Sequence, residues 1–284
     1  MYEDIEYSVD GRTALISFNR PHKLNAVRRQ TYLELFRALD EAERDDRVRS
    51  VIFTGKGRGF CAGADLDTGF VPSREGDPVT GENVRPDIGG TATLRLFDMR
   101  KPLIGAVNGP AIGFGATFLL PMDFRIASTT ARFGYVFTRR AIVAESCSSW
   151  FLPRIVGMPT ALDWMLTGRI FEAAEAKAAG LVRDVVEAEA LLPAAFAIAD
   201  EIASTTSPAS VAFNRQLIWR MQAVDHPRIA HDYESRALAF TFRAADSAES
   251  TRAFHEKRPP NFVSTVADTA FTEQWWPRWE MPKE

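Results

Sequence analysis

The chain has 284 residues, of which 46% are hydrophobic, enough for a buried core in one large domain or one domain with an appendage. Its net charge is -3 and its Lys and Arg residues are scattered, which argues against binding to nucleic acid or to an anionic membrane. The acidic start is unlike a signal peptide, and no apolar run approaches the roughly 20 residues that span a bilayer. We therefore expect a globular, cytoplasmic protein.

The N-terminal part has the pattern of a parallel α/β fold. Residues 13–19 are rich in β-branched and aromatic side chains and predict a strand, which Pro21 ends. Apolar side chains recur at helical spacing over 29–44, and a second strand pattern covers 47–54. This β-α-β order favours a right-handed crossover and parallel pairing, with the sheet beginning at Thr13.

A glycine-rich stretch and a long loop follow the second predicted strand. The glycines of 55–59 lack the GxxxxGK[ST] pattern of a phosphate-binding loop. Residues 67–90 show no clear periodicity and predict a long loop, a kind of segment that is usually functional or mobile. A short helix is expected over 91–99.

The stretch 103–128 predicts a strand, a glycine-rich turn, a buried helix and another strand in succession. Gly113 and Gly115 flank a point where the backbone can closely approach another group, and the helix is expected over 116–120. Free amides at that helix start favour an anion or a polarised carbonyl oxygen. The alternative is that small residues simply let the helix pack tightly on the sheet.

The C-terminal half is predicted to be mainly helical. A β-like segment at 131–138 is followed by a less regular stretch at 139–153, and helical patterns then dominate apart from a short strand at 181–186. The tail beyond Pro260 is rich in aromatic residues and is expected to cover another part of the protein. Cys61 and Cys147 lie far apart without a metal-binding pattern, so no metal site is predicted.

Eight motifs, in order along the chain, resemble those of the enoyl-CoA hydratase/isomerase family, or crotonase superfamily. They are RPHKLNAV (20–27), GRGFCAGADL (57–66), KPLIGAVNGPAIGFGA (101–116), FRIAS (124–128), ARFG (131–134), LTGR (166–169), AGLV (179–182) and FHEKRPPNF (254–262).

This resemblance implies an α/β, crotonase-like spiral of repeated β-β-α turns, with a helical C-terminal trimerisation region. We assign 1–205 to the spiral core, 206–260 to the trimerisation region and 261–284 to an aromatic C-terminal tail. The resemblance also implies an acyl-CoA or enoyl-CoA substrate, with coenzyme A as part of that substrate and no separate cofactor. A homotrimer or homohexamer is expected.

Family chemistry depends on two backbone amides that bind the thioester oxygen and stabilise an enolate. By motif position, the resemblance assigns these amides to Ala64 and Phe114. The family's usual middle residue at the second position is glycine, so Phe114 requires a compatible backbone conformation. The two glutamates that hydratases of this family commonly carry are replaced by Thr117 and Phe137, neither of which is a general base at neutral pH.

Glu145 is the remaining candidate acid/base, because it resembles the position at which some isomerases and a dehalogenase of the superfamily carry their working carboxylate. On the family template it is surrounded by apolar groups, and such desolvation raises a carboxyl pKa. The surrounding side chains are expected to be Phe114, Tyr135, Phe137 and Trp150. The alternative is a structural salt bridge to Arg139, Arg140 or Arg154.

The resemblance also suggests residues around the CoA-bearing part of the ligand. These are Lys23, Leu24, Ala62, Asp65, Leu66, Phe137, Trp150 and Lys257, with the Asp65 side chain more suited to ordering its own loop. No Ser-His-Asp arrangement or GxSxG pattern suggests a serine hydrolase. Double-bond isomerisation by Glu145 is the favoured function. Hydration of a 2-enoyl-CoA and acyl-CoA binding without turnover are the alternatives.

Overall fold

The computed structural model describes residues 2–68, 79–80 and 84–276. Its strands are β1 (Ile5–Asp10), β2 (Thr13–Phe18), β3 (Ser50–Gly55), β4 (Leu103–Val107), β5 (Ala111–Ile112), β6 (Phe124–Ser128), β7 (Arg132–Gly134), β8 (Ile170–Glu172) and β9 (Asp184–Val186). Its α-helices are α1 (Arg29–Arg44), α2 (Ile88–Asp98), α3 (Phe114–Thr117), α4 (Ser148–Val156), α5 (Met158–Thr167), α6 (Ala173–Ala178), α7 (Leu191–Thr205), α8 (Pro208–Arg220), α9 (Pro227–Thr241) and α10 (Ala245–Glu256).

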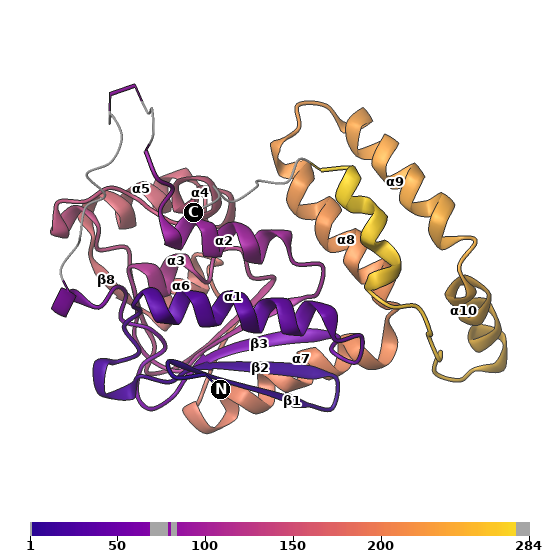
Figure 1. The fold of residues 1–284 in the computed structure, drawn as a ribbon, viewed down its shortest axis with the longest axis horizontal. Helices are drawn as coiled ribbons and strands as arrows, with labels where there is room; N and C mark the ends of the chain where they lie inside the picture. The colour runs from indigo at the N-terminus through magenta and orange to yellow at the C-terminus, as the bar shows by residue number, and fades with distance from the viewer. Residues whose placement is uncertain (1, 69–78, 81–83, 277–284) are drawn as a thin grey trace.

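Two sheets organise the first two thirds of the chain. The larger sheet has the strand order β1-β2-β3-β4-β6-β9, and all its pairs are parallel except β1 with β2 (Figure 1). The smaller sheet has the order β5-β7-β8. The predicted parallel α/β class is therefore confirmed, including the parallel β2-α1-β3 unit.

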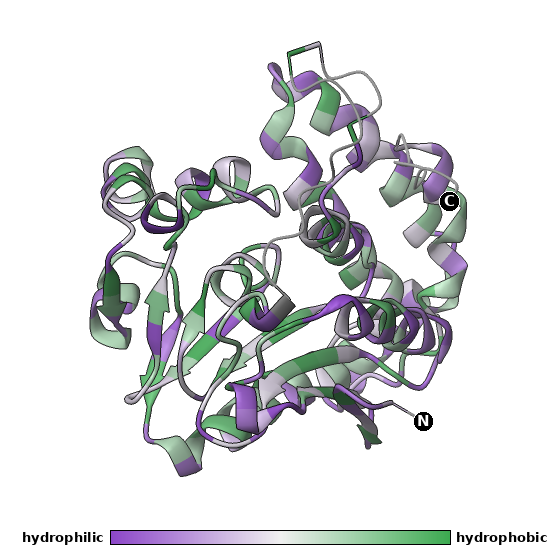
Figure 2. Cartoon of the chain, turned by 60° about the vertical axis from the view of Figure 1, so that its left-hand side comes forward, coloured by the Kyte–Doolittle hydropathy of each residue, from purple (hydrophilic) through white to green (hydrophobic). Residues whose placement is uncertain are grey.

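The larger sheet is covered on both faces, which explains its continuous apolar strands. Successive β3 side chains point to opposite faces: Val51 and Phe53 belong to the main core with α1 and α2, whereas Ile52 packs in a second core against α7. The central strands accordingly appear hydrophobic in Figure 2, whereas the helices over them alternate polar and apolar residues. The rigid sheet then presents its connecting turns at one edge.

The first strand of the sheet contradicts the sequence prediction. We expected the sheet to begin at Thr13, but β1 precedes it and pairs antiparallel with β2. The polar residues of β1 hid it, because only Ile5 at its start is fully buried. The buried Glu34 carboxylate on α1 accepts the backbone N–H groups of Glu3, Asp4 and Ile5, which fixes the start of β1 against the helix.

Two predicted helices in the central region lie at shifted positions. The helix expected over 116–120 is the four-residue α3, which begins at Phe114 and ends at Thr117. The helix expected over 91–99 is α2, which begins at Ile88 because Asp87 caps it by accepting the Gly90 N–H at 2.5 Å. The predicted loop 67–90 therefore ends earlier, and 69–78 and 81–83 within it lie outside the described residues.

The stretch 139–153, expected to be irregular, contains most of helix α4. Pro153 lies inside this helix and conceals it from a propensity argument. The strand expected over 181–186 is shorter, since β9 covers only its last three residues. Strand β5 has two residues and was not predicted. In the described part of the chain, no helix has both the length and the apolar composition that crossing a membrane requires.

Helices α8, α9 and α10 form a separate helical layer beside the part of the chain that holds the two sheets (Figure 1). Helix α7 ends at Thr205, next to the predicted boundary at 205, while the three-part division of the chain stays a prediction. The tail covers α8 and α9, as its aromatic residues suggested: Trp275 stacks on Phe213, and Trp276 packs on Tyr233. These contacts bury the inner surface of the helical layer.

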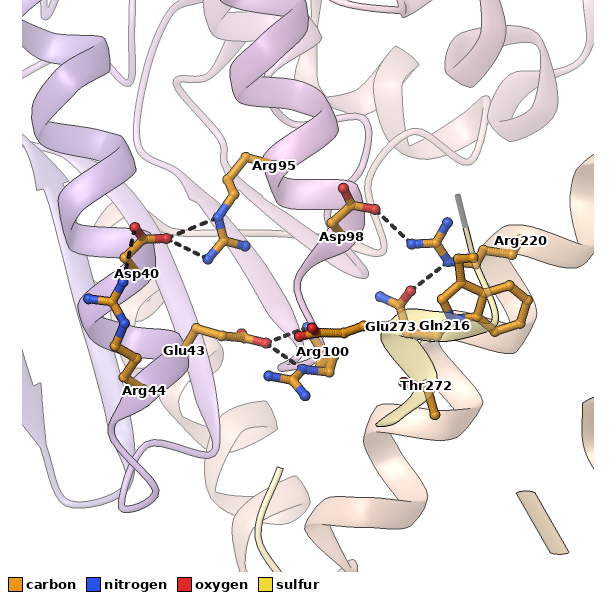
Figure 3. Close-up of a pocket in the computed structure, with 11 residues that line it drawn as sticks. Asp40, Glu43, Arg44, Arg95, Asp98, Arg100, Gln216, Arg220, Thr272 and Glu273 are labelled. Carbon is orange, nitrogen blue, oxygen red and sulfur yellow. Dashed lines mark hydrogen bonds and ion pairs between the residues drawn. The ribbon is translucent and has the colours of Figure 1, made fainter. Parts of the chain in front are cut away.

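A cavity lined by charged side chains lies between this helical layer and helices α1 and α2 (Figure 3). Its charges form cross-element pairs, with Arg95 to Asp40 at 2.9 Å, Arg100 to Glu43 at 2.9 Å and Arg220 to Asp98 at 2.7 Å. Such pairing is what a structural junction requires, so we do not place the ligand here.

Candidate active site

A second cavity, of about 340 Å³, lies at the turns around β5 and α3. Most of its lining comes from four segments, around residues 62–66, 87–89, 112–114 and 136–145, together with Tyr32 of α1. Apolar side chains predominate, and the polar lining groups are few. This combination of an apolar wall and few polar groups is typical of a small-molecule site.

The backbone of Ala64 has its N–H group directed away from the neighbouring chain. Ala64 forms a parallel bridge with Val27, in which Gly63 O accepts from Val27 N and Asp65 N donates to Val27 O. Because backbone groups alternate along an extended chain, the N–H of Ala64 points to the other side. No described residue accepts a hydrogen bond from it, and Ala64 lines the cavity.

The N–H of Phe114 is free for a related reason. Phe114 is the first residue of α3, and the first amides of a helix have no partner within it. Across the described ranges, no acceptor for this N–H is found. Phe114 has no positive φ, so the phenylalanine fits the backbone there, while Gly113 before it takes the left-handed φ of 55°.

The two amide segments lie side by side at the cavity. A Cβ built on Gly63 would be 3.8 Å from the Phe114 nitrogen, and one on Gly113 would be 3.9 Å from the Gly63 Cα. Gly115 lets α3 approach this closely, because a Cβ there would collide with the carbonyl oxygen of Cys61. The structure therefore brings together the two predicted oxyanion-binding segments.

Glu145 lies in the same cavity, held by two hydroxyl groups. Thr117 Oγ1 donates to its Oε1 at 3.0 Å, and Ser146 Oγ donates to its Oε2 at 2.5 Å. Desolvation by burial raises the pKa of Glu145 above its ordinary value, although both hydroxyl groups oppose that shift. A raised pKa brings a carboxyl group closer to the range that suits proton transfer near neutral pH.

The alternative of a structural salt bridge at Glu145 is wrong for the described residues. Arg139 donates instead to Thr167 O, and Arg154 to Trp150 O. Arg140 lines the cavity, but the partners of the Glu145 carboxylate among the described residues are the hydroxyl groups of Thr117 and Ser146.

The expected apolar wall around Glu145 is only partly confirmed. Phe114 and Phe137 line the cavity, whereas Tyr135 and Trp150 do not. Tyr135 stacks on Trp164 in the core, and Trp150 packs on Phe97 and Phe151. Tyr135, just after β7, and Trp150 on α4 thus direct their rings into these contacts and away from the cavity, which spacing along the chain did not reveal.

Tyr32 and Asp87 are among the lining residues that the sequence analysis missed. Tyr32 packs its ring edge-on against Phe114, and burial raises its pKa well above the ordinary value, so it stays neutral. Asp87 is exposed at the N-terminus of α2 and lies beside Glu145. Its position as an N-cap, an Asp before an apolar helix, was the available signal.

Most residues predicted to contact CoA lie close to one another. Leu24 accepts the Ala62 N–H through its carbonyl oxygen, so the turn of 23–25 lies against 61–63. Ala62 and Leu66 line the cavity. Lys23 forms an ion pair with Asp67, which places its ammonium near the start of η2 (Leu66–Thr68).

Asp65 and Lys257 are placed differently from these residues. Asp65 pairs with Arg20 at 2.7 Å and also accepts the Asp67 N–H, which supports its role in ordering the loop. Lys257 follows the end of α10 as its C-cap, in a left-handed conformation, and is absent from the residues that line the cavity. The structure of one chain therefore does not bring Lys257 to the cavity. In the described ranges, no cluster of three or more potential metal ligands occurs.

The chain is similar to known proteins over most of its length. A model of the family described as enoyl-CoA hydratase/isomerase matches residues 9–265. The chain is 36% identical to "Enoyl-CoA hydratase AFT3-1" of Alternaria alternata over 90% of this chain and 84% of that protein. It is 34% identical to "1,2-epoxyphenylacetyl-CoA isomerase" of Escherichia coli, covering 93% and 99%.

A solved structure of an enoyl-CoA hydratase from Bacillus anthracis is similar throughout. It has a TM-score of 0.83 and 31% identity, covering 92% of this chain and 99% of that one. These similarities extend over the spiral, the cavity and the C-terminal helices, and they confirm the crotonase fold. The chain belongs to the enoyl-CoA hydratase/isomerase family.

Proposed function

We propose that this protein converts an enoyl-CoA thioester through an enolate, with double-bond isomerisation as its favoured reaction. The observation that carries the proposal is one partly buried carboxyl group, Glu145, in the same cavity as the free amides of Ala64 and Phe114. Fully buried Thr117 and Phe137, which replace the family's usual glutamates, supply no second base there.

The proposed reaction uses these groups in sequence. The thioester oxygen accepts the N–H groups of Ala64 and Phe114, which stabilise the negative charge that develops on it. The Glu145 carboxylate takes a proton from one carbon, and the bonding electrons move into the conjugated enolate. Glu145 then returns the proton two carbons away, so that the double bond moves and no water is consumed.

Thr117 supports Glu145 in this proposal. Its hydroxyl group donates to Oε1 and thereby orients the carboxylate without competing for the proton. The residue that replaces a family glutamate thus positions the remaining acid.

Hydration of a 2-enoyl-CoA is the second candidate. It is supported by the name of the Alternaria relative, an enoyl-CoA hydratase. In this reaction Glu145 also activates water, and the product gains a hydroxyl group. Binding of acyl-CoA without turnover is a third outcome that the experiment below detects.

The proposed function also includes contacts with the CoA part of the substrate and a homo-oligomeric state. We infer that Lys23 and Leu24 contact the CoA part of the substrate, with Ala62, Leu66 and Phe137 beside the thioester and acyl group. Lys257 stays a proposed contact for the nucleotide end. The CoA thioester is the substrate itself, and we propose a homotrimer or homohexamer acting in the cytoplasm without an added cofactor.

The test compares wild type with Glu145→Gln on 2-enoyl-CoA and 3-enoyl-CoA in heavy water. Gln keeps the size and hydrogen bonds but removes the base, so turnover is expected to fall by roughly 10²- to 10⁴-fold with acyl-CoA affinity nearly unchanged. Product analysis follows double-bond position, hydroxyl formation and deuterium uptake.

Each product identifies one reaction. A moved double bond supports isomerisation, with deuterium uptake only to the extent that Glu145 exchanges its proton with solvent before returning it, and a new hydroxyl group supports hydration. Binding by wild type with neither product formed contradicts both. Full activity of Glu145→Gln would remove Glu145 from its assigned role.

A further inference from the structure

Two carboxyl groups converge on Gly89, at the start of helix α2. A Cβ built on Gly89 would lie 2.5 Å from Glu145 Oε2 and 3.2 Å from Asp87 Oδ1. Both carboxyl groups therefore border the space that the missing side chain leaves. Both residues also line the cavity.

We propose that Asp87 is a positioning residue of the active site. Its negative charge lies across the Gly89 backbone from Glu145 and favours the protonated form of the Glu145 carboxyl group. This inference rests on the proposed acid/base role of Glu145. Asp87 is the N-cap of α2, and it differs from the two motif positions at which the family commonly carries its glutamates.

The two carboxyl groups have opposite surroundings. Asp87 is exposed to solvent, and its Oδ1 accepts the Gly90 N–H. Glu145 is partly buried, against Thr117 and Ser146, and burial disfavours its charged form. Of two neighbouring carboxyl groups in different surroundings, the more desolvated one keeps the proton.

The other titratable groups near Glu145 do not replace Asp87 as its anionic neighbour. Burial raises the pKa of Tyr32 on α1 well above its usual value, raises that of Cys61 to about 12, and raises that of Cys147 before α4, so all three stay neutral. Arg140 lines the cavity and opposes Asp87, but it is exposed and screened by water. Among the described residues, Asp87 is thus the anion beside Glu145.

The proton on Glu145 matters for the enolate reaction. A protonated Glu145 can donate to carbon but cannot accept, so the pair sets the pH above which the base form becomes available. The negative charge of Asp87 therefore shifts the acid limb of the pH-rate profile to higher pH, although the Asp87 side chain does not contact the substrate.

The decisive variants are Asp87→Asn and Asp87→Ser, which remove the charge. Asn and Ser both cap helices well, so α2 should be retained. Asp10→Asn is the matched control, because it removes the same charge from an exposed position on β1.

Protonation is measured by infrared spectroscopy of the carboxyl C=O stretch as a function of pH, with 13C-labelled glutamate to separate Glu from Asp. The Glu145 band is the one that Glu145→Gln lacks. Its midpoint is expected to fall by about 0.5 to 1 pH unit in both Asp87 variants and to stay unchanged in Asp10→Asn. An unmoved midpoint in Asp87→Asn and Asp87→Ser would overturn the inference.

The pH profile of turnover gives the second readout. Its acid limb is expected to move to lower pH by the same amount as the infrared midpoint. If no enoyl-CoA is turned over by wild type, the proposed function fails, while the infrared titration still decides whether Asp87 acts on Glu145.

Discussion

At the scale of single residues, the site depends on a carboxyl group kept in an unfavourable place. Burial raises the pKa of Glu145, so between its unfolded and folded pKa values the folded protein binds more protons than the unfolded chain. The contribution of Glu145 to stability is therefore fully present at low pH and is lost as pH rises through the raised pKa.

Glu145→Gln is accordingly expected to be more stable than wild type at neutral pH. The difference should shrink as the pH falls through about 4, the ordinary pKa range of a glutamate, below which Glu145 is protonated in both the folded and the unfolded chain. Urea unfolding of both proteins at the two pH values measures this. A variant less stable at neutral pH would show that the charged carboxylate is instead well compensated by Thr117 and Ser146.

Gly89 is the second residue on which the site depends. In Gly89→Ala the new Cβ would meet Glu145 Oε2 at 2.5 Å, so the carboxylate must rotate away from its two hydroxyl partners. We expect turnover to fall at least about 10-fold, because displaced catalytic groups lose much of their effect.

Stability should respond differently from activity in Gly89→Ala. Alanine favours a helix over glycine by at most about 1 kcal/mol, the value for a helix interior, and Gly89 lies in the first turn of α2, so this gain offsets only part of the displacement cost. Thermal unfolding and turnover measured on the same sample separate the two effects. Unchanged turnover would mean that the Glu145 carboxylate can work from another position.

At the scale of elements, Arg215 holds α8 against the spiral. Its buried guanidinium pairs with Asp123 at 2.7 Å and donates to the carbonyl oxygens of Leu96 and Pro121. Arg215→Met leaves Asp123 and these carbonyl groups without their partner. Breaking a buried pair in this way costs about 3 to 5 kcal/mol.

The free energy of unfolding from urea titration measures that loss. Arg228→Met is the matched control, since Arg228 on α9 is exposed and its loss should change stability by less than about 0.5 kcal/mol. Equal effects of the two substitutions would contradict the assigned role of Arg215.

At the scale of the whole molecule, the helical layer keeps large apolar side chains exposed. Ile218 on α8 is 65% exposed, Leu238 on α9 is 49% exposed, and Phe242 after α9 is 72% exposed. An apolar surface of this kind is typical of a subunit interface. We expect light scattering to give a trimer or a hexamer.

Phe242→Asp tests whether this surface forms the interface. It should shift the protein toward monomers, because a carboxylate would be buried at the contact. Val9→Asp, on β1 and 37% exposed, is the control and should leave assembly unchanged. A wild-type monomer would remove the proposal, and an unaffected Phe242→Asp assembly would place the interface elsewhere.

The sequence by itself determined the class of fold and the motif-bearing turns. Continuous apolar strands with an amphipathic helix between them predicted the parallel sheet, because burial on both faces leaves that pattern along the chain. The glycines at 113 and 115 predicted the close backbone approach at α3. A Cβ on Gly115 would collide with Cys61 O, and Gly113 takes a positive φ. Glu145 became the candidate acid/base because Thr117 and Phe137 occupy the positions of the family's two usual glutamates.

Only the tertiary structure decided what surrounds Glu145. Thr117 and Asp87 are distant from Glu145 along the chain, and only the folded chain brings α3 and the start of α2 to that carboxyl group. Trp150 and Tyr135 point elsewhere, although their positions along the chain suggested the cavity. Local patterns report the periodicity of an element, whereas the direction of each side chain across a cavity depends on long-range packing.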